Sequence, residues 1–276
     1  PLHSSVPQEE QQAVFTPAKE GTMKIILSTN IAESSVTIDD VLSVIDAGLV
    51  REMSYNAESA MSSMETVLIS SASATQRSGR AGRVAPGSCF RLYSRGVHAS
   101  MAERPTPEIQ RTALEATCLQ TAAMTESGIQ RFLSRALDPP SEDTVMYAVD
   151  RLTKLGAIQT IESGEKLTAL GRTISNLPID PAIARMLLLG CVTKCLDPVL
   201  TAAASYSSRD PFYTPPGMRD EARAIRKSFH DSSDLLSVCR AWDQCNDLFN
   251  NRDYDTARHW GSDNFISIAA MSNLTS

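Results

Sequence analysis

Residues 76–83 carry the residue types and spacing best suited to chemistry on a phosphate group. They read Gln-Arg-Ser-Gly-Arg-Ala-Gly-Arg, so three arginines lie within seven residues and are separated by small residues. We predict a helix over about residues 73–82, on which Arg80 and Arg83 would share one face. Two guanidinium groups on one face can each give paired hydrogen bonds to phosphate oxygens. The pattern favours a polyanion site, and the alternative is a solvated basic helix end.

Positive charge is concentrated around this segment. From Arg77 to Arg111 the chain has seven arginines and two acidic residues, a local charge of +5, whereas the whole chain has a net charge of −6. An anion site requires such a local concentration. The overall acidity excludes a generally basic nucleic-acid coat protein. Local basic grooves stay open, because phosphate binding depends on where the arginines lie.

A second polar segment, residues 28–39, directly follows a short apolar run. It reads Ser-Thr-Asn-Ile-Ala-Glu-Ser-Ser-Val-Thr-Ile-Asp. Loops at the carboxyl ends of parallel strands are where α/β folds bind ligands, and these hydroxyl and amide groups can hold phosphate or ribose. Clusters of this composition are also ordinary turns, so the segment alone is weak evidence.

The apolar runs of residues 1–96 predict an α/β domain that would position both segments. Residues 24–28 and 41–46 are short and β-branched, which indicates strands buried on both faces. Residues 66–69 and 89–93 are further candidate strands, and the predicted helix lies between them in the sequence.

Residues 97–168 predict helices followed by one hairpin. Apolar residues one turn apart indicate a helix near residues 114–122. A second helix should begin after Ser141 as its N-cap and end at Gly156 in the C′ position. Residues 157–161 and 166–168 then predict two strands of a hairpin, with a turn over residues 162–165. Helices followed by a hairpin are typical of a winged helix.

Residues 169–276 predict an all-helical bundle. Asp-Pro pairs begin at Asp180, Asp197 and Asp210, and each places a capping residue before a proline suited to the first helical position. The third pair can also be a simple turn. Trp242 and Trp260 could stack on bases, but packing in or near a core is the favoured interpretation.

The composition excludes several classes of protein. The chain has 276 residues, of which 42% are hydrophobic and 21% charged, which is neither a disordered nor a collagen-like composition. The longest apolar stretch is about half of a membrane span, and we expect no signal peptide, since no cationic and apolar leader is seen. Six cysteines without a CxxC pair indicate reduced thiols rather than a zinc site. We expect no metal site, no membrane contact and an intracellular protein, cytoplasmic or nuclear.

Together the two polar segments resemble known motifs. Residues 28–39 resemble motif V, and residues 76–83 match motif VI, of the DEAH/RHA group of superfamily 2 RNA helicases. Further stretches resemble this family in its own order along nearly the whole chain: residues 1–4, 11–15, 86–93, 107–111, 137–140, 170–171 and 177–181.

The resemblance implies a fold of three parts. These are a RecA-like α/β domain of P-loop NTPase type (a partial second lobe, residues 1–96), a winged helix (residues 97–168) and an all-α helical bundle, the ratchet or helicase-associated domain (residues 169–276). Residues 51–68 would carry the hairpin that separates nucleic-acid strands.

The resemblance also implies roles for particular side chains. Arg80 and Arg83 would be arginine fingers, with Gln76 beside them, facing ATP between two RecA-like lobes. The remaining roles are nucleotide sensing by Ser35, ribose contacts by Thr37 and Asp39, and contacts to the RNA backbone by Thr29 and Asn30.

Two motifs of such an enzyme do not occur in this sequence. It has no GxxxxGK[ST] segment and no DExH segment, and the Asp-Glu-Ala-Arg string at Asp220 lies too far along the chain. The implied cofactor is ATP with Mg²⁺, the metal being held by the first lobe. We expect a helicase segment that does not hydrolyse ATP alone. Its expected partners are RNA, that first lobe and a C-terminal domain of the oligonucleotide-binding type.

The favoured function is an ATP-dependent RNA helicase or RNP remodeller. The alternative is a non-catalytic RNA-binding scaffold that has lost the ATPase lobe. Residues 76–83 argue against the scaffold, because it has no need of two arginine fingers. A DNA-directed helicase is a third, minor reading, since contacts to the 2′-OH cannot be read from these residues.

Overall fold

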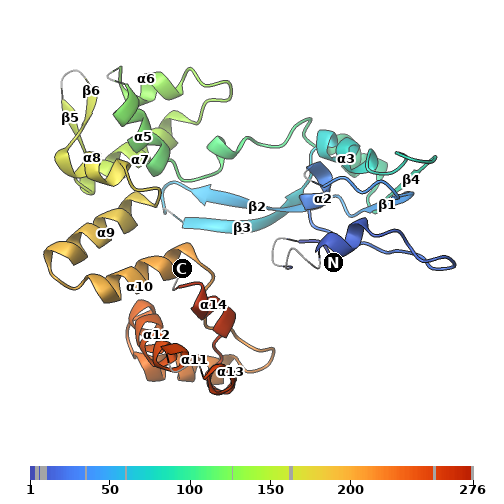
Figure 1. The fold of residues 1–276 in the computed structure, drawn as a ribbon. Helices are drawn as coiled ribbons and strands as arrows, with labels where there is room; N and C mark the ends of the chain where they lie inside the picture. The colour runs from blue at the N-terminus through green and yellow to red at the C-terminus, as the bar shows by residue number, and fades with distance from the viewer. Residues whose placement is uncertain are drawn as a thin grey trace. The chain divides into compact units, whose positions relative to one another are not determined.

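The computed structural model describes all residues except 4, 5, 7–10, 35, 60, 126, 162, 163, 251, 252, 275 and 276. The chain forms two compact units, residues 1–114 with 127–150 and residues 115–126 with 151–276. The first unit mixes strands and helices, and the second is mostly helical (Figure 1).

The first unit contains a parallel pair of strands, β1 (Ser43–Asp46) and β4 (Ser88–Arg91). Their register places Ser43 opposite Ser88 and Asp46 opposite Arg91. Helix α3 (Ser71–Ser78) lies in the connection between them and packs against β1. The strands predicted at residues 41–46 and 89–93 are therefore present. The predicted burial of the first strand on both faces is wrong, because Ile45 is 71% exposed.

Residues 24–28 form no strand, contrary to prediction. A single isolated bridge joins Leu2 to Ser28. Ile25 and Leu27 are 75% and 73% exposed, so the expected burial on both faces is wrong. Only Ile26 packs inward, against a small cluster that includes Leu2. A strand needs a ladder of hydrogen bonds to its neighbour, and the described residues give this run one bridge.

A long hairpin lies between β1 and α3 in the sequence. Strands β2 (Leu49–Asn56) and β3 (Met61–Leu68) pair in antiparallel fashion, with Leu49 opposite Leu68. Figure 1 shows this hairpin extending away from α3, β1 and β4. The strand predicted at residues 66–69 is the end of β3, and the hairpin expected over residues 51–68 is present.

Short elements complete the first unit: η1 (Ala13–Phe15), α2 (Ile31–Ser34), α4 (Arg95–Ser100), η2 (Glu108–Gln110) and α6 (Ile129–Leu133). Helix α7 (Glu142–Lys154) begins in this unit and ends in the other. The Ser141 cap is confirmed, because its Oγ accepts the Thr144 N–H at 3.2 Å. A second apolar cluster of Ile69, Ala74 and Met101 supports α3.

The second unit begins with α5 (Glu115–Met124), which confirms the helix predicted near residues 114–122. Strands β5 (Ile158–Ile161) and β6 (Gly164–Leu167) form the predicted hairpin, and α8 (Ala169–Ser175) packs on α5. Gly156 has φ +75°, as expected of a C′ glycine.

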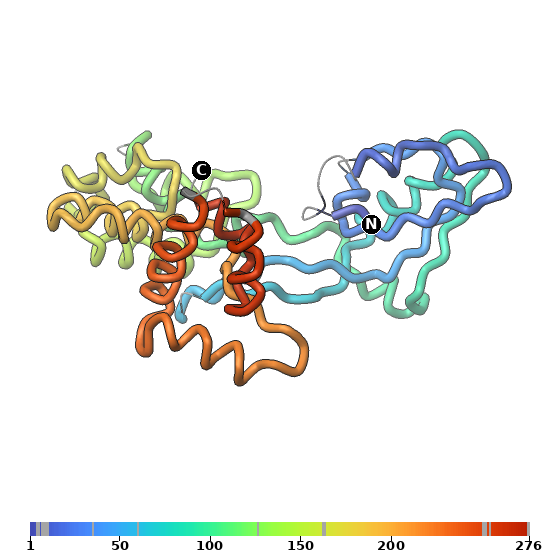
Figure 2. The backbone as a smooth tube through the Cα atoms, turned by 60° about the horizontal axis from the view of Figure 1, so that its bottom comes forward, coloured from blue at the N-terminus to red at the C-terminus, as the bar shows by residue number. Residues whose placement is uncertain are grey.

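Six helices follow: α9 (Pro181–Val192), α10 (Leu196–Ser207), α11 (Arg219–Phe229), α12 (Asp234–Asn250), α13 (Tyr254–Asp263) and α14 (Ile268–Ser272). Helix α10 packs on α9 and α12, and α11 packs on α12 (Figure 2). Trp242 and Trp260 pack against a core that includes Phe229 and Cys245, so their prediction as core residues is confirmed.

The three Asp-Pro pairs differ in what they do. Asp180 caps α9, since its Oδ1 accepts the Ala182 N–H at 2.8 Å. Asp197 does not cap a helix, because α10 begins one residue earlier and Asp197 lies inside its first turn. Asp210 forms a turn, in which it accepts the Phe212 N–H at 3.0 Å. Among the described residues, no helix has the length and apolar character needed to cross a membrane.

Candidate functional site

Helix α3 ends before Arg80 and Arg83, the two arginines that it was predicted to carry. It begins after Ser70, whose Oγ accepts the Ser73 N–H at 3.1 Å, and its last residue is Ser78. Arg80 and Arg83 follow in a loop, so the prediction that they share one helical face is wrong. Gly82 has φ +83°, a conformation that glycine adopts readily and a continuing helix does not allow.

This loop folds back closely on itself. A Cβ atom on Gly87 would lie 2.4 Å from the backbone nitrogen of Gly82, so only glycine fits at residue 87 without displacement. The Gly82 N–H also approaches the Val41 carbonyl at 3.4 Å. The two glycines therefore hold the loop beside the start of β1.

Arg77, the first arginine of the segment, is compensated by two carboxylates. Its Nε lies 2.9 Å from Glu33 Oε2, and its Nη1 lies 2.9 Å from Asp46 Oδ1. The Arg77 side chain is 15% exposed and that of Asp46 is 1% exposed. The pairs tie α3 to α2 and to the end of β1, so Arg77 positions the loop.

Asp46 is the buried centre of this network. It accepts hydrogen bonds from the Gly48 N–H at 3.0 Å, Arg77 at 2.9 Å and the Tyr93 hydroxyl at 2.9 Å. Burial acts to raise the pKa of Asp46, but these hydrogen bonds outweigh it and leave the pKa below its ordinary value. Burial and then the bond to Asp46 raise the pKa of Tyr93 to about 12.

Arg80 has unused hydrogen-bonding capacity. Its Nη1 lies 3.5 Å from the Val36 carbonyl, a long contact, and its buried Nε has no hydrogen-bond partner in the described part of the chain. A buried guanidinium N–H without a partner costs free energy that an anion could recover. Arg83 and Gln76 are exposed. These donors fit a phosphate-bearing group.

The structure brings part of the predicted site together. Val36 belongs to the same loop as Thr37 and Asp39, so its contact with Arg80 joins the two polar segments. Thr37 and Asp39 are exposed, as are Thr29 and Asn30 just before α2. Ser35 lies outside the described residues. Among the residues described, no group of three or more His, Cys, Asp or Glu side chains could hold a metal ion.

Glu33 and Asp46 were missed as members of the site. The available signal for Asp46 was a carboxylate directly after two apolar residues of a predicted strand. Such a buried acid needs a cationic partner, and Arg77 of the arginine-rich segment supplies one.

Three family models match parts of this chain. Residues 1–85 match the helicase conserved C-terminal domain. Residues 148–179 match the winged-helix part of the helicase associated domain HA2, and residues 180–238 match its ratchet-like part. The α/β unit with its arginine loop and the helices after it thus define a helicase C-terminal region.

Named relatives agree with these matches. The chain is 44% identical over 242 residues to the DExH-box ATP-dependent RNA helicase DExH3 of Arabidopsis thaliana, covering 87% of this chain and 20% of that protein. It is 44% identical over 246 residues to the human ATP-dependent DNA/RNA helicase DHX36, covering 88% and 24%. Over 284 residues it is 40% identical to the mouse putative ATP-dependent RNA helicase DHX57, covering 100% and 20%.

The chain belongs to the DEAH/RHA-type superfamily 2 RNA helicases. It spans about a fifth to a quarter of the length of these curated relatives.

Proposed function

We propose that the protein is an ATP-dependent RNA helicase or RNP remodeller, and that this chain supplies its second RecA-like lobe and helicase-associated domains. The observation that carries the proposal is Arg80, a half-buried guanidinium with an unused N–H, in a loop that Arg77 anchors to Glu33 and Asp46. The names of the relatives support it.

The domain boundaries that we propose are residues 1–96 for the partial RecA-like lobe, 97–168 for a winged helix and 169–276 for a helical ratchet. The family matches at residues 1–85, 148–179 and 180–238 support this order. The β5–β6 hairpin after α7 would be the wing.

At the nucleotide, Arg80 and Arg83 would bind phosphate oxygens and stabilise the charge that develops on them, with Gln76 beside them. Bound ATP would supply the phosphoryl group, with its Mg²⁺ held by a first RecA-like lobe. Arg77 would act indirectly, since its ion pairs fix the position of the loop. Ser35, Thr37 and Asp39 would complete the nucleotide contacts.

At the RNA, the exposed side chains of Thr29 and Asn30 would contact the backbone, and the β2–β3 hairpin would part paired strands. The partners would be RNA, the first lobe and a C-terminal domain of the oligonucleotide-binding type. We place the protein inside the cell, in the cytoplasm or nucleus. Its six cysteines form no disulfide, which suits a reducing compartment.

The test is RNA-stimulated ATP hydrolysis by the longest natural chain that contains this segment, compared with its Arg80→Ala variant. Loss of an arginine finger should reduce turnover by about 10³-fold or more, while RNA binding persists. Arg131→Ala is the control, because Arg131 is an exposed arginine on α6, away from the loop in sequence.

Equal turnover in the parent and the Arg80→Ala variant would refute the arginine-finger role. RNA binding without turnover in the parent would identify the scaffold alternative instead. Hydrolysis stimulated by DNA and not by RNA would favour the DNA-directed alternative.

A further inference from the structure

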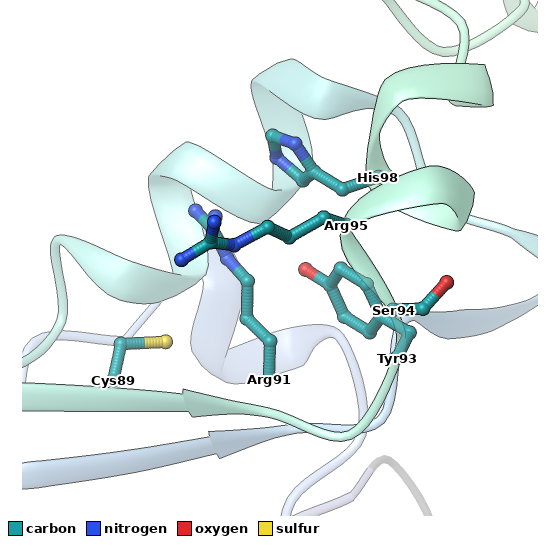
Figure 3. A pocket seen from close by; sticks show the side chains of 6 residues that line it. All are labelled: Cys89, Arg91, Tyr93, Ser94, Arg95 and His98. Carbon is teal, nitrogen blue, oxygen red and sulfur yellow. The ribbon is translucent and has the colours of Figure 1, made fainter.

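A hollow of about 590 Å³ lies on the first unit where β4 ends and α4 begins. Its lining residues are Cys89, Arg91, Tyr93, Ser94, Arg95 and His98. Figure 3 shows Arg91 extending from the strand and Arg95 reaching from the helix, with both guanidinium groups in the hollow. None of the lining residues belongs to residues 28–39 or 76–83.

The positive charge of this hollow is not compensated by the described residues. In contrast to Arg77, neither Arg91 nor Arg95 has a hydrogen bond or ion pair from its side chain to a described residue. The nearby acid is Asp46, which is buried and already bound to Arg77, Tyr93 and Gly48. Two cations that share a hollow repel each other, and an anion between them would remove that cost.

The walls of the hollow are well positioned. The Tyr93 ring is fixed by its hydroxyl group, which donates to Asp46 at 2.9 Å. The His98 ring lies parallel to it within 10°, with ring centroids 6.2 Å apart. Ser94 accepts the Val97 N–H at 3.2 Å, and its hydroxyl proton remains a donor. These groups would orient a ligand that the arginines attract.

We propose that this hollow binds a phosphate group through Arg91 and Arg95. The planar guanidinium forks match phosphate oxygens in paired hydrogen bonds. The phosphate can be carried by a small ester such as a nucleotide or by the backbone of an RNA strand. The site is separate from the Arg80 loop, and it does not depend on ATP hydrolysis.

Calorimetric titration of the 276-residue chain tests the site with three probes: inorganic phosphate, pyrophosphate and a short single-stranded RNA. The double variant Arg91→Gln/Arg95→Gln should weaken binding of at least one probe by about tenfold per arginine, the loss expected for charged hydrogen bonds. The control is Arg131→Gln/Arg135→Gln, which removes the same charge from exposed arginines of the same unit. All four side chains are exposed, so thermal melting should be unchanged in both variants.

Alkylation of Cys89, followed by peptide mass spectrometry, locates the bound probe. Cys89 lines the hollow, whereas Cys191 and Cys195 are exposed on the second unit and serve as internal references. If phosphate or pyrophosphate slows the alkylation of Cys89 and not that of Cys191 and Cys195, the ligand is a small phosphate ester. If only RNA slows the alkylation of Cys89, the ligand is the backbone of an RNA strand.

Two results would overturn the proposal. One is equal affinity of the double variant and the control for every probe. The other is a rate of Cys89 modification that none of the three probes changes.

Discussion

The arginines from Arg77 to Arg111 differ in what surrounds them. Arg77 is held by Glu33 and Asp46, and the Nε of Arg111 lies 3.9 Å from Glu52 Oε2. Arg80 retains a buried N–H without a partner in the described chain. Residues of one type, close together in sequence, therefore serve structure in one case and are available to a ligand in another.

Replacing Asp46 by Asn tests the structural role of the Arg77 network. The variant leaves a buried guanidinium with one carboxylate, so the free energy of unfolding should fall by about 3 kcal/mol or more. Asp40→Asn is the control, since Asp40 is 43% exposed in its pair with Lys24 and should lose about 1 kcal/mol or less. Urea denaturation followed by circular dichroism measures both. Equal losses would contradict the assignment of Arg77 as a buried anchor.

Asp46 should also make stability depend on pH in the acid range. Its pKa is lowered in the folded chain, so around the ordinary carboxyl pKa the unfolded state binds more protons. Its contribution is then present above the unfolded pKa and is lost as the pH falls through the folded pKa. Denaturation of the parent and Asp46→Asn at several pH values below about 5 should show a steeper loss in the parent. Parallel curves would rule out this linkage.

At the scale of elements, local signals placed two helix starts correctly and misplaced others. Ser141 and Asp180 cap the helices that follow them, as predicted. Asp197 instead lies inside the first turn of α10, and α3 begins at Ser71, before its predicted start. Helix α3 ends at Ser78, although its sequence suggested four more residues. The glycine-rich stretch after it turns instead, because Gly82 adopts a positive φ and Gly87 packs against it.

Gly87→Ala should disturb the arginine loop. The added Cβ would lie 2.4 Å from the Gly82 nitrogen, and such overpacking costs about 1–3 kcal/mol. Gly96→Ala is the matched control of opposite sign. Gly96 lies in α4, and a Cβ atom added there would have Ser94 Oγ as its nearest neighbour, at 3.7 Å. Alanine at this position should therefore stabilise by about 0.4–1 kcal/mol. Chemical denaturation measures the free energy of unfolding of both variants. An unchanged value for Gly87→Ala would show that the loop backbone can shift to accommodate the added Cβ atom.

A charge on the buried face of α7 tests the helix that precedes the β5–β6 hairpin. Val145 is 1% exposed, whereas the adjacent Met146 is 59% exposed. Val145→Asp should cost about 3 kcal/mol or more, because it buries an unpaired carboxylate. Met146→Asp should change stability by less than about 0.5 kcal/mol. Val149, on the same helix, is half-buried and would give a smaller effect. Similar melting temperatures for the two aspartate variants would be inconsistent with this burial.

At the scale of the whole molecule, the net charge of −6 hides a positive charge of +5 in residues 77–111. Ion pairs with acids elsewhere in the chain neutralise part of this positive charge. Two of the seven arginines from 77 to 111 have carboxylate partners outside that segment. The five that remain are Arg80, Arg83, Arg91, Arg95 and Arg104. The contribution of residues 77–111 to any RNA affinity should therefore come from a few local contacts.

The salt dependence of RNA binding measures how many of these contacts form. For a single strand, log K falls with log salt by about 0.7 for each neutralised phosphate, so five arginines limit the slope to about 3.5. Fluorescence anisotropy with a labelled single strand at several salt concentrations gives this slope. The Arg91→Gln/Arg95→Gln variant should reduce it if the RNA backbone occupies the hollow. A slope far above this limit would indicate basic residues elsewhere in the chain.

The sequence by itself determined the order of β1, α3 and β4, the Ser141 and Asp180 caps, the Gly156 helix end and the two polar segments. Each depends on backbone and side-chain chemistry within a few residues. Tertiary structure alone decided which arginine is neutralised, because Glu33 and Asp46 lie 44 and 31 residues from Arg77 in sequence. It also decided that Ile25 and Leu27 stay exposed, since a strand forms only where a neighbouring segment completes its ladder. Charge compensation and strand pairing both require residues that are distant in the chain, and a local pattern carries no information about them.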